Sequence, residues 1–309
     1  MEAMQIPLLI YNPAAAKGKA ARLLPRVQAL LGARGLAYDL ALTHSAGHAQ
    51  ALSRAAAEAG RPLVLAAGGD GTVNECINGL MQAQLDGKPR PALGVLPVGR
   101  GNDFAFGAGL PGELAAACNT LAAGSRRAID LGRARVDGGA PRFFGNGLGL
   151  GFDAVVGFEA NRMQRLSGVA SYLVGVARAI FLYARAPVYE IDCDGERVQG
   201  PFLMVSVMNG RRLAGAFRMA PSADPADGLF DLCLAGQVSQ AKIPGIAVLF
   251  LRGQQAGHPA IQMTRARRVS VRALEGRIPA HVDGEMLCEA GQSLEIELFP
   301  AALEIITPA

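Results

Sequence analysis

A glycine-rich turn around a single carboxylate is the part of this sequence best suited to chemistry: Gly68-Gly69-Asp70-Gly71-Thr72. An apolar run at residues 62–67 precedes it, and a helix-forming pattern at residues 73–84 follows. Glycines let a backbone approach phosphate oxygens, and free N–H groups at a helix start point toward an anion. A carboxylate in such a turn makes sense if Mg²⁺ lies between it and the phosphate. The turn therefore predicts a phosphate site with Asp70 near a metal, and a turn without a ligand is the alternative.

Three further carboxylates lie where a turn meets a predicted element. Asp103 follows an apolar run and begins a helix-forming segment, so it is either a helix cap or a site residue. Asp283 and Glu285 bracket Gly284 after the strand-like run at residues 278–282, a pattern typical of an ordinary hairpin turn. The four histidines form no metal-ligand set, and we expect them at the surface.

Strand-like and helix-like segments alternate over the first 130 residues. The strand-like runs are at residues 6–11, 37–43, 63–67 and 92–96, and the helical patterns are at residues 18–33, 46–59, 73–84 and 112–122. This alternation predicts a doubly wound parallel sheet with helices on both faces. Ligands of such sheets bind beyond the carboxyl ends of the strands, which places Asn12, residues 68–72 and residues 99–103 at one rim.

From about residue 125 the pattern changes to short alternating runs separated by turn signals. The strand-like runs are at residues 128–136, 142–150, 188–193, 198–209, 229–235, 269–274, 278–282 and 294–298. Asp194-Gly195 predicts a type I′ hairpin, and helical patterns interrupt at residues 154–184 and 240–251. The sequence therefore predicts an α/β domain at residues 1–130 and a β-sandwich domain at residues 131–309.

Composition limits the classes of function. Half of the 309 residues are hydrophobic and 18% are charged, as in globular proteins. The five cysteines include no Cys-x-x-Cys pair, and the start resembles no signal peptide, so we expect free thiols in the cytoplasm. The net charge of +4 is too small to indicate nucleic-acid binding, but it is compatible with an anionic membrane surface.

The motifs together resemble the diacylglycerol kinase-like superfamily, which includes bacterial soluble lipid kinases, sphingosine and ceramide kinases and, more distantly, NAD kinases. The resemblance covers nearly the whole chain. It is carried by residues 66–75, by Asn12-Pro13 with Lys17 behind it, by Gly101-Asn102-Asp103-Phe104-Ala105, by Asp227-Gly228-Leu229-Phe230-Asp231 and by His281-Val282-Asp283-Gly284-Glu285. In family members the last segment returns to the first domain, which residues 303–306 could do here.

This resemblance implies an ATP- and Mg²⁺-dependent lipid kinase, with the active site in the cleft between a nucleotide-binding domain and a lipid-acceptor domain. The implied nucleotide contacts are Asn12, Lys17, Gly68, Gly69, Gly71, Thr72, Glu75, Gly99, Gly101 and Asn102. The implied metal ligands are Asp70, Asp227 and Asp283. The implied catalytic residues are Asp70, Asp103 and Glu285, of which Glu285 is the expected general base for the lipid hydroxyl. Asp130 resembles a member of the same acidic network.

Two positions depart from the family pattern. Arg100 stands where the family commonly has Thr, and Ala226 stands where a second acid often precedes Asp227. The alternatives to a lipid kinase are an NAD kinase-like enzyme and a lipid-binding regulator without turnover. The Asn-Pro, Gly-Asn-Asp-Phe-Ala and Asp-Gly-Glu motifs favour the lipid kinases. The sequence does not identify the acceptor lipid.

Two acid-free stretches carry arginines among apolar residues. They are residues 160–189, with Arg162, Arg165, Arg178 and Arg185, and residues 208–223, with Arg211, Arg212 and Arg218. A basic amphipathic surface suits peripheral docking on anionic lipid, while a buried helix with solvated or paired arginines is the alternative. The expected partners are thus a lipid substrate and a membrane surface, and a homodimer is left open.

Overall fold

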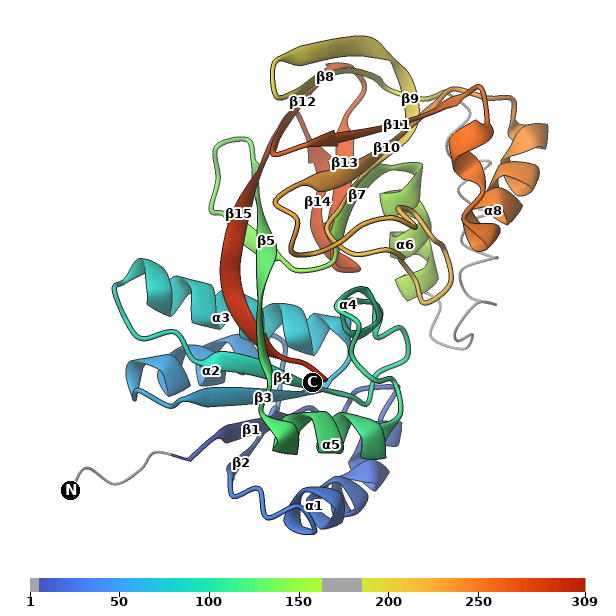
Figure 1. The fold of residues 1–309 in the computed structure, drawn as a ribbon. Coiled ribbons are helices and arrows are strands. Elements are labelled where there is room, and N and C mark those ends of the chain that lie inside the picture. The colour runs from blue at the N-terminus through green and yellow to red at the C-terminus, as the bar shows by residue number, and fades with distance from the viewer. Residues whose placement is uncertain (1–5, 163–184, 309) are drawn as a thin grey trace. The chain divides into compact units, whose positions relative to one another are not determined.

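The computed structural model describes residues 6–162 and 185–308, without the side chains of residues 159–162, and divides the chain into two compact units (Figure 1). Unit 1 comprises Met1–Asp130 and Ala301–Ala309, and unit 2 comprises Leu131–Pro300. The chain therefore leaves unit 1 once and returns to it at its end. In the described residues no helix is both long and apolar enough to span a membrane.

Unit 1 contains a parallel sheet in the order β2-β1-β3-β4-β15. Its strands are β1 (Leu8–Tyr11), β2 (Asp39–Leu42), β3 (Leu63–Gly68), β4 (Ala92–Pro97) and the end of β15 (Ser293–Ile306). All residues of β3 and β4 are buried, which explains their continuous apolar runs. The last strand joins this sheet through the pairing of Ile305 with Leu93.

Helices cover both faces of this sheet: α2 and α3 lie on one side, and α1 and α5 on the other (Figure 1). The helical segments are η1 (Lys19–Leu23), α1 (Leu24–Gly32), α2 (His48–Glu58), α3 (Asp70–Leu85), α4 (Asp103–Gly107) and α5 (Leu114–Ala123). The single helix expected at residues 18–33 is divided into η1 and α1. Proline is tolerated only in the first turn of an α-helix, and Pro25 accordingly lies in the first turn of α1.

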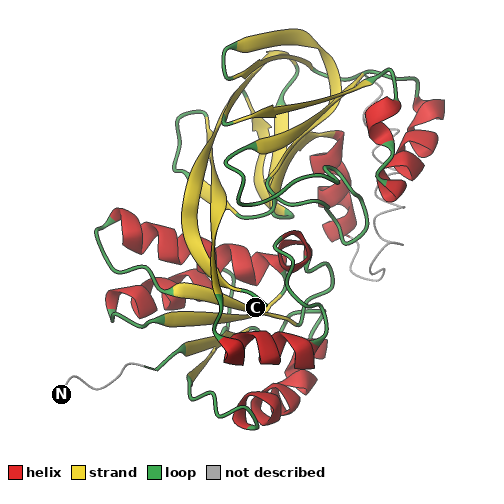
Figure 2. Cartoon of the chain, in the orientation of Figure 1, coloured by secondary structure: helices red, strands yellow, loops and turns green. Residues whose placement is uncertain are grey.

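Unit 2 is a sandwich of two mainly antiparallel sheets that share β9 (Glu196–Met208) (Figure 2). The first half of β9 pairs with β8 (Val188–Cys193). The same sheet continues through β12 (Arg268–Glu275), β15, β5 (Arg126–Val136) and β6 (Arg142–Phe144). The second half of β9 lies between β7 (Gly147–Gly151) and β10 (Phe230–Gly236). That sheet also contains β11 (Ile261–Ala266), β13 (Ile278–Val282) and β14 (Glu285–Gly291).

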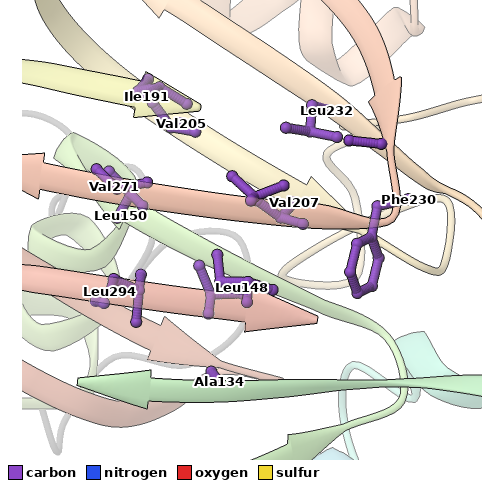
Figure 3. Close-up of a cluster of buried hydrophobic side chains, with 14 of the residues drawn as sticks. Ala134, Leu148, Leu150, Ile191, Val205, Val207, Phe230, Leu232, Val271 and Leu294 are labelled. Carbon is purple, nitrogen blue, oxygen red and sulfur yellow. The ribbon is translucent and has the colours of Figure 1, made fainter. Parts of the chain in front are cut away.

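The core of unit 2 lies between the two sheets (Figure 3). Leu148, Leu150, Val205 and Val207 come from one sheet, and Ile191, Val271 and Leu294 come from the other. The helical segments of this unit are α6 (Phe152–Arg162), η2 (Gln240–Lys242), α8 (Ile243–Arg252) and η3 (Gln255–Gly257). The predicted two-residue hairpin is present, with positive φ at Asp194 (52°) and Gly195 (98°) between β8 and β9.

Candidate active site

The glycine turn joins β3 to α3 in unit 1. The first amides of an α-helix have no intrahelical acceptors, and in the described part of the chain no side chain caps the 16-residue α3 at its N-cap Gly69. A Cβ atom on Gly68 would lie 2.3 Å from both Cβ and Oγ1 of Thr72, so only glycine fits there. The turn is therefore packed tightly against Thr72 and precedes a helix start of the kind that can bind an anion, and the phosphate contacts of this turn stay a prediction.

A second turn, between β4 and α4, touches the first. A Cβ atom on Gly99 would lie 2.3 Å from the Cα atom of Gly69, so the two backbones approach as closely as glycines allow. Asn102 has a left-handed conformation (φ 53°), and its Oδ1 accepts a hydrogen bond from the Gly99 amide at 3.1 Å. This side-chain contact holds the turn in place and explains the asparagine at residue 102.

Two carboxylates converge at Gly101. A Cβ atom on this glycine would lie 2.9 Å from Oδ2 of Asp70 and 3.4 Å from Oδ2 of Asp103. The other oxygen of Asp70 accepts a hydrogen bond from the Phe104 amide at 3.0 Å, and Asp103 is buried. Mg²⁺ is commonly held by one or two carboxylates together with substrate phosphates. This donor set therefore fits the magnesium ion that the family implies.

The loop after β1 reaches the same place. Asn12 Nδ2 donates a hydrogen bond to Oγ1 of Thr72 at 2.9 Å, and Asn12 Oδ1 accepts one from the Ala14 amide at 3.0 Å. Ala16 and Lys17 have positive φ values of 53° and 58°, which for such residues costs about 1–2 kcal/mol each. Strain of this kind is concentrated at ligand-binding sites. The predicted convergence of three loops at one rim is confirmed, while the role of each residue stays a prediction.

Glu75 has a structural partner that the sequence did not reveal. Its Oε1 and Oε2 accept hydrogen bonds from the amides of Gly47 (2.8 Å) and Ala49 (3.0 Å) at the start of α2. Gly47 is the N-cap of α2 and has no side chain to cap it, so the carboxylate of a neighbouring helix does so. These contacts account for Glu75 without a nucleotide, and its nucleotide contact remains a prediction.

The two carboxylates of the hairpin between β13 and β14, Asp283 and Glu285, lie in different surroundings. Asp283 and Gly284 form the two-residue turn between β13 and β14, with φ values of 48° and 82°. The buried Asp283 accepts hydrogen bonds from the amides of Gly145 (3.0 Å), Asn146 (2.9 Å) and Gly147 (2.9 Å). Its carboxylate thus holds the loop between β6 and β7, which gives it a structural role, and its metal role stays a prediction.

Glu285, by contrast, is exposed at the start of β14. No hydrogen bond or ion pair holds its carboxylate within the part of the chain that the structure describes. A solvated carboxylate of this kind is free to meet a substrate hydroxyl. The structure thus leaves Glu285 available for the role of a base and engages its neighbour Asp283 elsewhere.

Asp227, the third predicted metal ligand, faces an arginine. Its Oδ2 pairs with Nη2 of Arg265, whose Nε lies 3.6 Å from Oδ2 of Asp231. Burial raises the pKa of the Asp231 carboxyl, and the Arg265 guanidinium opposes this rise. Within the described residues no cluster of three His, Cys, Asp or Glu side chains could hold a metal ion. The Arg265 guanidinium thus faces both carboxylates, and the metal role of Asp227 stays a prediction.

An apolar pocket in unit 2 was not predicted. It contains about 650 Å³ of space, including its opening to solvent. Its apolar walls come from α6, β9, β10, α8 and the adjoining loops, and they include Phe152, Val156, Leu203, Met219, Ile246 and Phe250. The acidic residue in this lining is Asp153, whose Oδ2 lies 3.2 Å from Nε2 of the buried His281. The expectation that all four histidines lie at the surface is therefore wrong for His281.

The predicted membrane arginines can be followed only in part. Arg165 and Arg178 lie outside the described residues, as does the side chain of Arg162. Of the second acid-free stretch, Arg211 and Arg218 are exposed and Arg212 is half-buried. The Arg211 guanidinium donates a hydrogen bond to the Ala223 carbonyl oxygen at 2.8 Å.

Comparisons with known proteins identify the family of this chain. Residues 7–134 match the diacylglycerol kinase catalytic domain, and residues 147–307 match the YegS C-terminal NAD kinase beta sandwich-like domain. A diacylglycerol kinase of Bacillus subtilis is 34% identical over 280 residues, covering 90% of this chain and 88% of the relative. A diacylglycerol kinase of Mycobacterium tuberculosis is 29% identical over 301 residues, which cover 97% of this chain and 94% of the relative.

Solved structures show the same fold. A diacylglycerol kinase of Bacillus anthracis superposes with a TM-score of 0.74 at 22% identity and covers 100% of this chain and 98% of its own. A yeast NADH kinase superposes with a TM-score of 0.52 at 8% identity and covers 100% of this chain and 85% of its own. With 34% identity to a relative along most of both chains, and with both domain models matched in order, this chain belongs to the diacylglycerol kinase family.

Proposed function

We propose that this protein is an ATP- and Mg²⁺-dependent lipid kinase that transfers the γ-phosphoryl group to the hydroxyl of diacylglycerol or a related lipid. The observation that carries the proposal is the convergence of the Asp70 and Asp103 oxygens beside the uncapped start of α3. Phosphoryl transfer depends mainly on positioning and on electrostatic stabilisation of the phosphate oxygens. The helix amides would position the phosphates, and the carboxylate pair would hold a Mg²⁺ ion that stabilises the charge of those phosphates.

On the nucleotide side, each loop has its own task. The first amides of α3 bind phosphate oxygens. The hydrogen bond between Asn12 and Thr72 fixes the distance between the loop after β1 and the glycine turn. Lys17, in its left-handed loop, adds a positive charge for the polyphosphate. Asp70 and Asp103 would hold Mg²⁺, which when bound neutralises charge that develops on the phosphates.

On the acceptor side, the proposed base is Glu285. Its exposed carboxylate takes the proton from the lipid hydroxyl, which does not demand a strong base when the transition state is loose. The pocket of unit 2 supports an acceptor with hydrocarbon chains, because its walls are almost entirely apolar. We further propose that the enzyme works in the cytoplasm at the surface of an anionic membrane.

A single assay tests the reaction. The purified chain is incubated with γ-labelled ATP, Mg²⁺ and one acceptor at a time: diacylglycerol, monoacylglycerol, phosphatidylglycerol, a long-chain base or NAD. Label in a lipid product supports the proposal. Label in NADP would instead assign an NAD kinase activity, an alternative suggested by the NAD kinase beta sandwich-like domain at residues 147–307. No label in any product would favour a lipid-binding protein without turnover. A folded Asp70→Asn variant serves as the control for contaminating kinases.

A further inference from the structure

Helix α8 is apolar on all of its sides although it lies at the surface of unit 2 (Figure 1). Its sequence, IPGIAVLFLR, contains no polar side chain before Arg252. Ile243, Ile246 and Phe250 face inward and are buried. A surface helix normally carries polar residues on its outer face, and a helix that is apolar all round is normally covered.

The outer face of α8 carries a stripe of exposed apolar side chains. Pro244, Val248 and Leu251 follow one another at intervals of four and three residues, which places them on one side of the helix. Val248 is 42% exposed and Leu251 is 37% exposed. Single exposed apolar residues need no explanation, but an aligned group on a helix without polar residues does.

Positive charges flank this stripe. Lys242 precedes α8, Arg252 ends it, and Arg218 lies beside its end, where a Cβ atom on Gly253 would be 3.2 Å from Arg218 Cδ. All three side chains are exposed, and across residues 6–162 and 185–308 none of them forms an ion pair. No acidic residue occurs between Asp231 and Glu275. The surroundings of the stripe thus attract anions and contain nothing nearby in the sequence to repel them.

We propose that α8 is the element that docks on the surface of an anionic bilayer. Val248 and Leu251 enter the boundary between headgroups and acyl chains, and the flanking cations contact lipid phosphates. This inference rests on the proposed lipid kinase function, because an enzyme with a lipid acceptor must reach it in a membrane. Lys242 and Arg252 lie at the two ends of the apolar stripe, an arrangement that suits an anionic lipid surface.

The position of α8 links this surface to the apolar pocket. Its inward side chains Ile243, Ile246 and Phe250 line that pocket, while Val248 and Leu251 point to solvent. Docking through the outer face therefore brings one wall of the pocket to the bilayer. An acyl chain leaving the membrane would then meet apolar surface within the thickness of one helix.

A binding experiment tests the stripe. The double variant Val248→Gln/Leu251→Gln keeps helix-forming side chains and removes the apolar stripe. We expect its partition onto phosphatidylglycerol-containing vesicles to fall by about tenfold or more, because the apolar area that the two side chains bury in lipid is lost. Leu85→Gln is the matched control, because Leu85 is 60% exposed at the end of a helix in unit 1. Equal binding of the double variant and the wild type would overturn the proposal.

A fluorescent reporter shows whether the helix itself enters the lipid. The chain contains no tryptophan, so Val248→Trp introduces a single reporter and Leu85→Trp its control. We expect a blue shift and quenching by brominated lipid for Val248→Trp on anionic vesicles, and neither for Leu85→Trp. A blue shift that depends on protein concentration without vesicles would mean that a second copy covers α8, and would overturn the proposal.

The kinase assay separates this proposal from the one on which it rests. Diacylglycerol in detergent micelles is presented without a bilayer, so the double variant should phosphorylate it like the wild type. Lipid insertion of the Val248→Trp reporter in a protein without kinase activity would refute the proposed function and leave the docking helix intact. Kinase activity on micelles with no insertion of that reporter would do the reverse.

Discussion

Replacing Gly101 by alanine is the sharpest test of the two-carboxylate site. The added Cβ atom would lie 2.9 Å from Asp70 Oδ2 and 3.4 Å from Asp103 Oδ2, at the point where the carboxylates converge. Gly101 does not have a positive φ, so alanine fits its backbone and only the crowding is new. The substitution therefore acts on the space between the two acids and leaves the turn itself unstrained.

The expected magnitude follows from this geometry. A Cβ contact as short as 2.9 Å forces Asp70 to shift, but its other oxygen is held by the Phe104 amide at 3.0 Å. The methyl group then competes with a metal ion for the same space. Misplacing a catalytic group by about 1 Å can cost about a hundredfold in rate. We expect the kcat of Gly101→Ala to fall by at least about a hundredfold.

The assay is lipid phosphorylation at saturating ATP, with thermal unfolding as the test of folding. Gly112→Ala is the matched control, because a Cβ atom there would meet nothing within 4 Å and its φ is ordinary. We expect this control to keep normal activity. A Gly101→Ala protein that unfolds at the wild-type temperature and turns over normally would show that Asp70 and Asp103 do not act together in the reaction.

Three other outcomes are expected. Glu285→Gln should lower kcat by about a hundredfold with little change in ATP affinity, and a selective loss of ATP affinity would place Glu285 at the nucleotide. Glu75→Ala should destabilise the fold by about 1–2 kcal/mol in urea unfolding while the KM for ATP is kept, and the reverse pattern would restore its nucleotide role. Burial raises the pKa of Asp231, so its contribution to stability is favourable at acid pH and is lost as the pH rises above the ordinary aspartate value of about 4. Asp231→Asn should therefore gain stability relative to the wild type as the pH rises from about 4 toward neutrality, and a constant difference would contradict this.

The sequence predicted those parts of the fold that carry local signals. The runs at residues 188–193 and 278–282 are strands with the expected bounds, since each is an apolar pattern closed by turn residues. It missed β11 and β14, because both are only partly buried and show no clear alternation. It also began α3 at residue 73 although the helix starts at Asp70, because glycines conceal a helix start.

The candidate site divides in the same way. The two glycine turns and the loop after β1 were expected at one rim, since parallel strands end at the same edge of a sheet. The partners of Glu75, of Asp283 and of His281 could not be predicted. Each of these side chains is hydrogen-bonded to residues far away in the sequence. A carboxylate that caps a distant helix stands in the same local sequence pattern as one that binds a ligand.

The ion pair between Asp227 and Arg265 lies next to Ala226, one of the two positions at which this chain departs from its family pattern. Ala226 removes an acid that family members often have before Asp227, and with one acid fewer a divalent cation would be held weakly. Asp227 and the buried Asp231 still need a positive charge, since burying a carboxylate without a partner is costly. Arg265, from the neighbouring strand β11, supplies that charge from within the fold. We therefore expect chelators to leave the loop before β10 in place, and any Mg²⁺ dependence of catalysis to trace to Asp70 and Asp103 in unit 1.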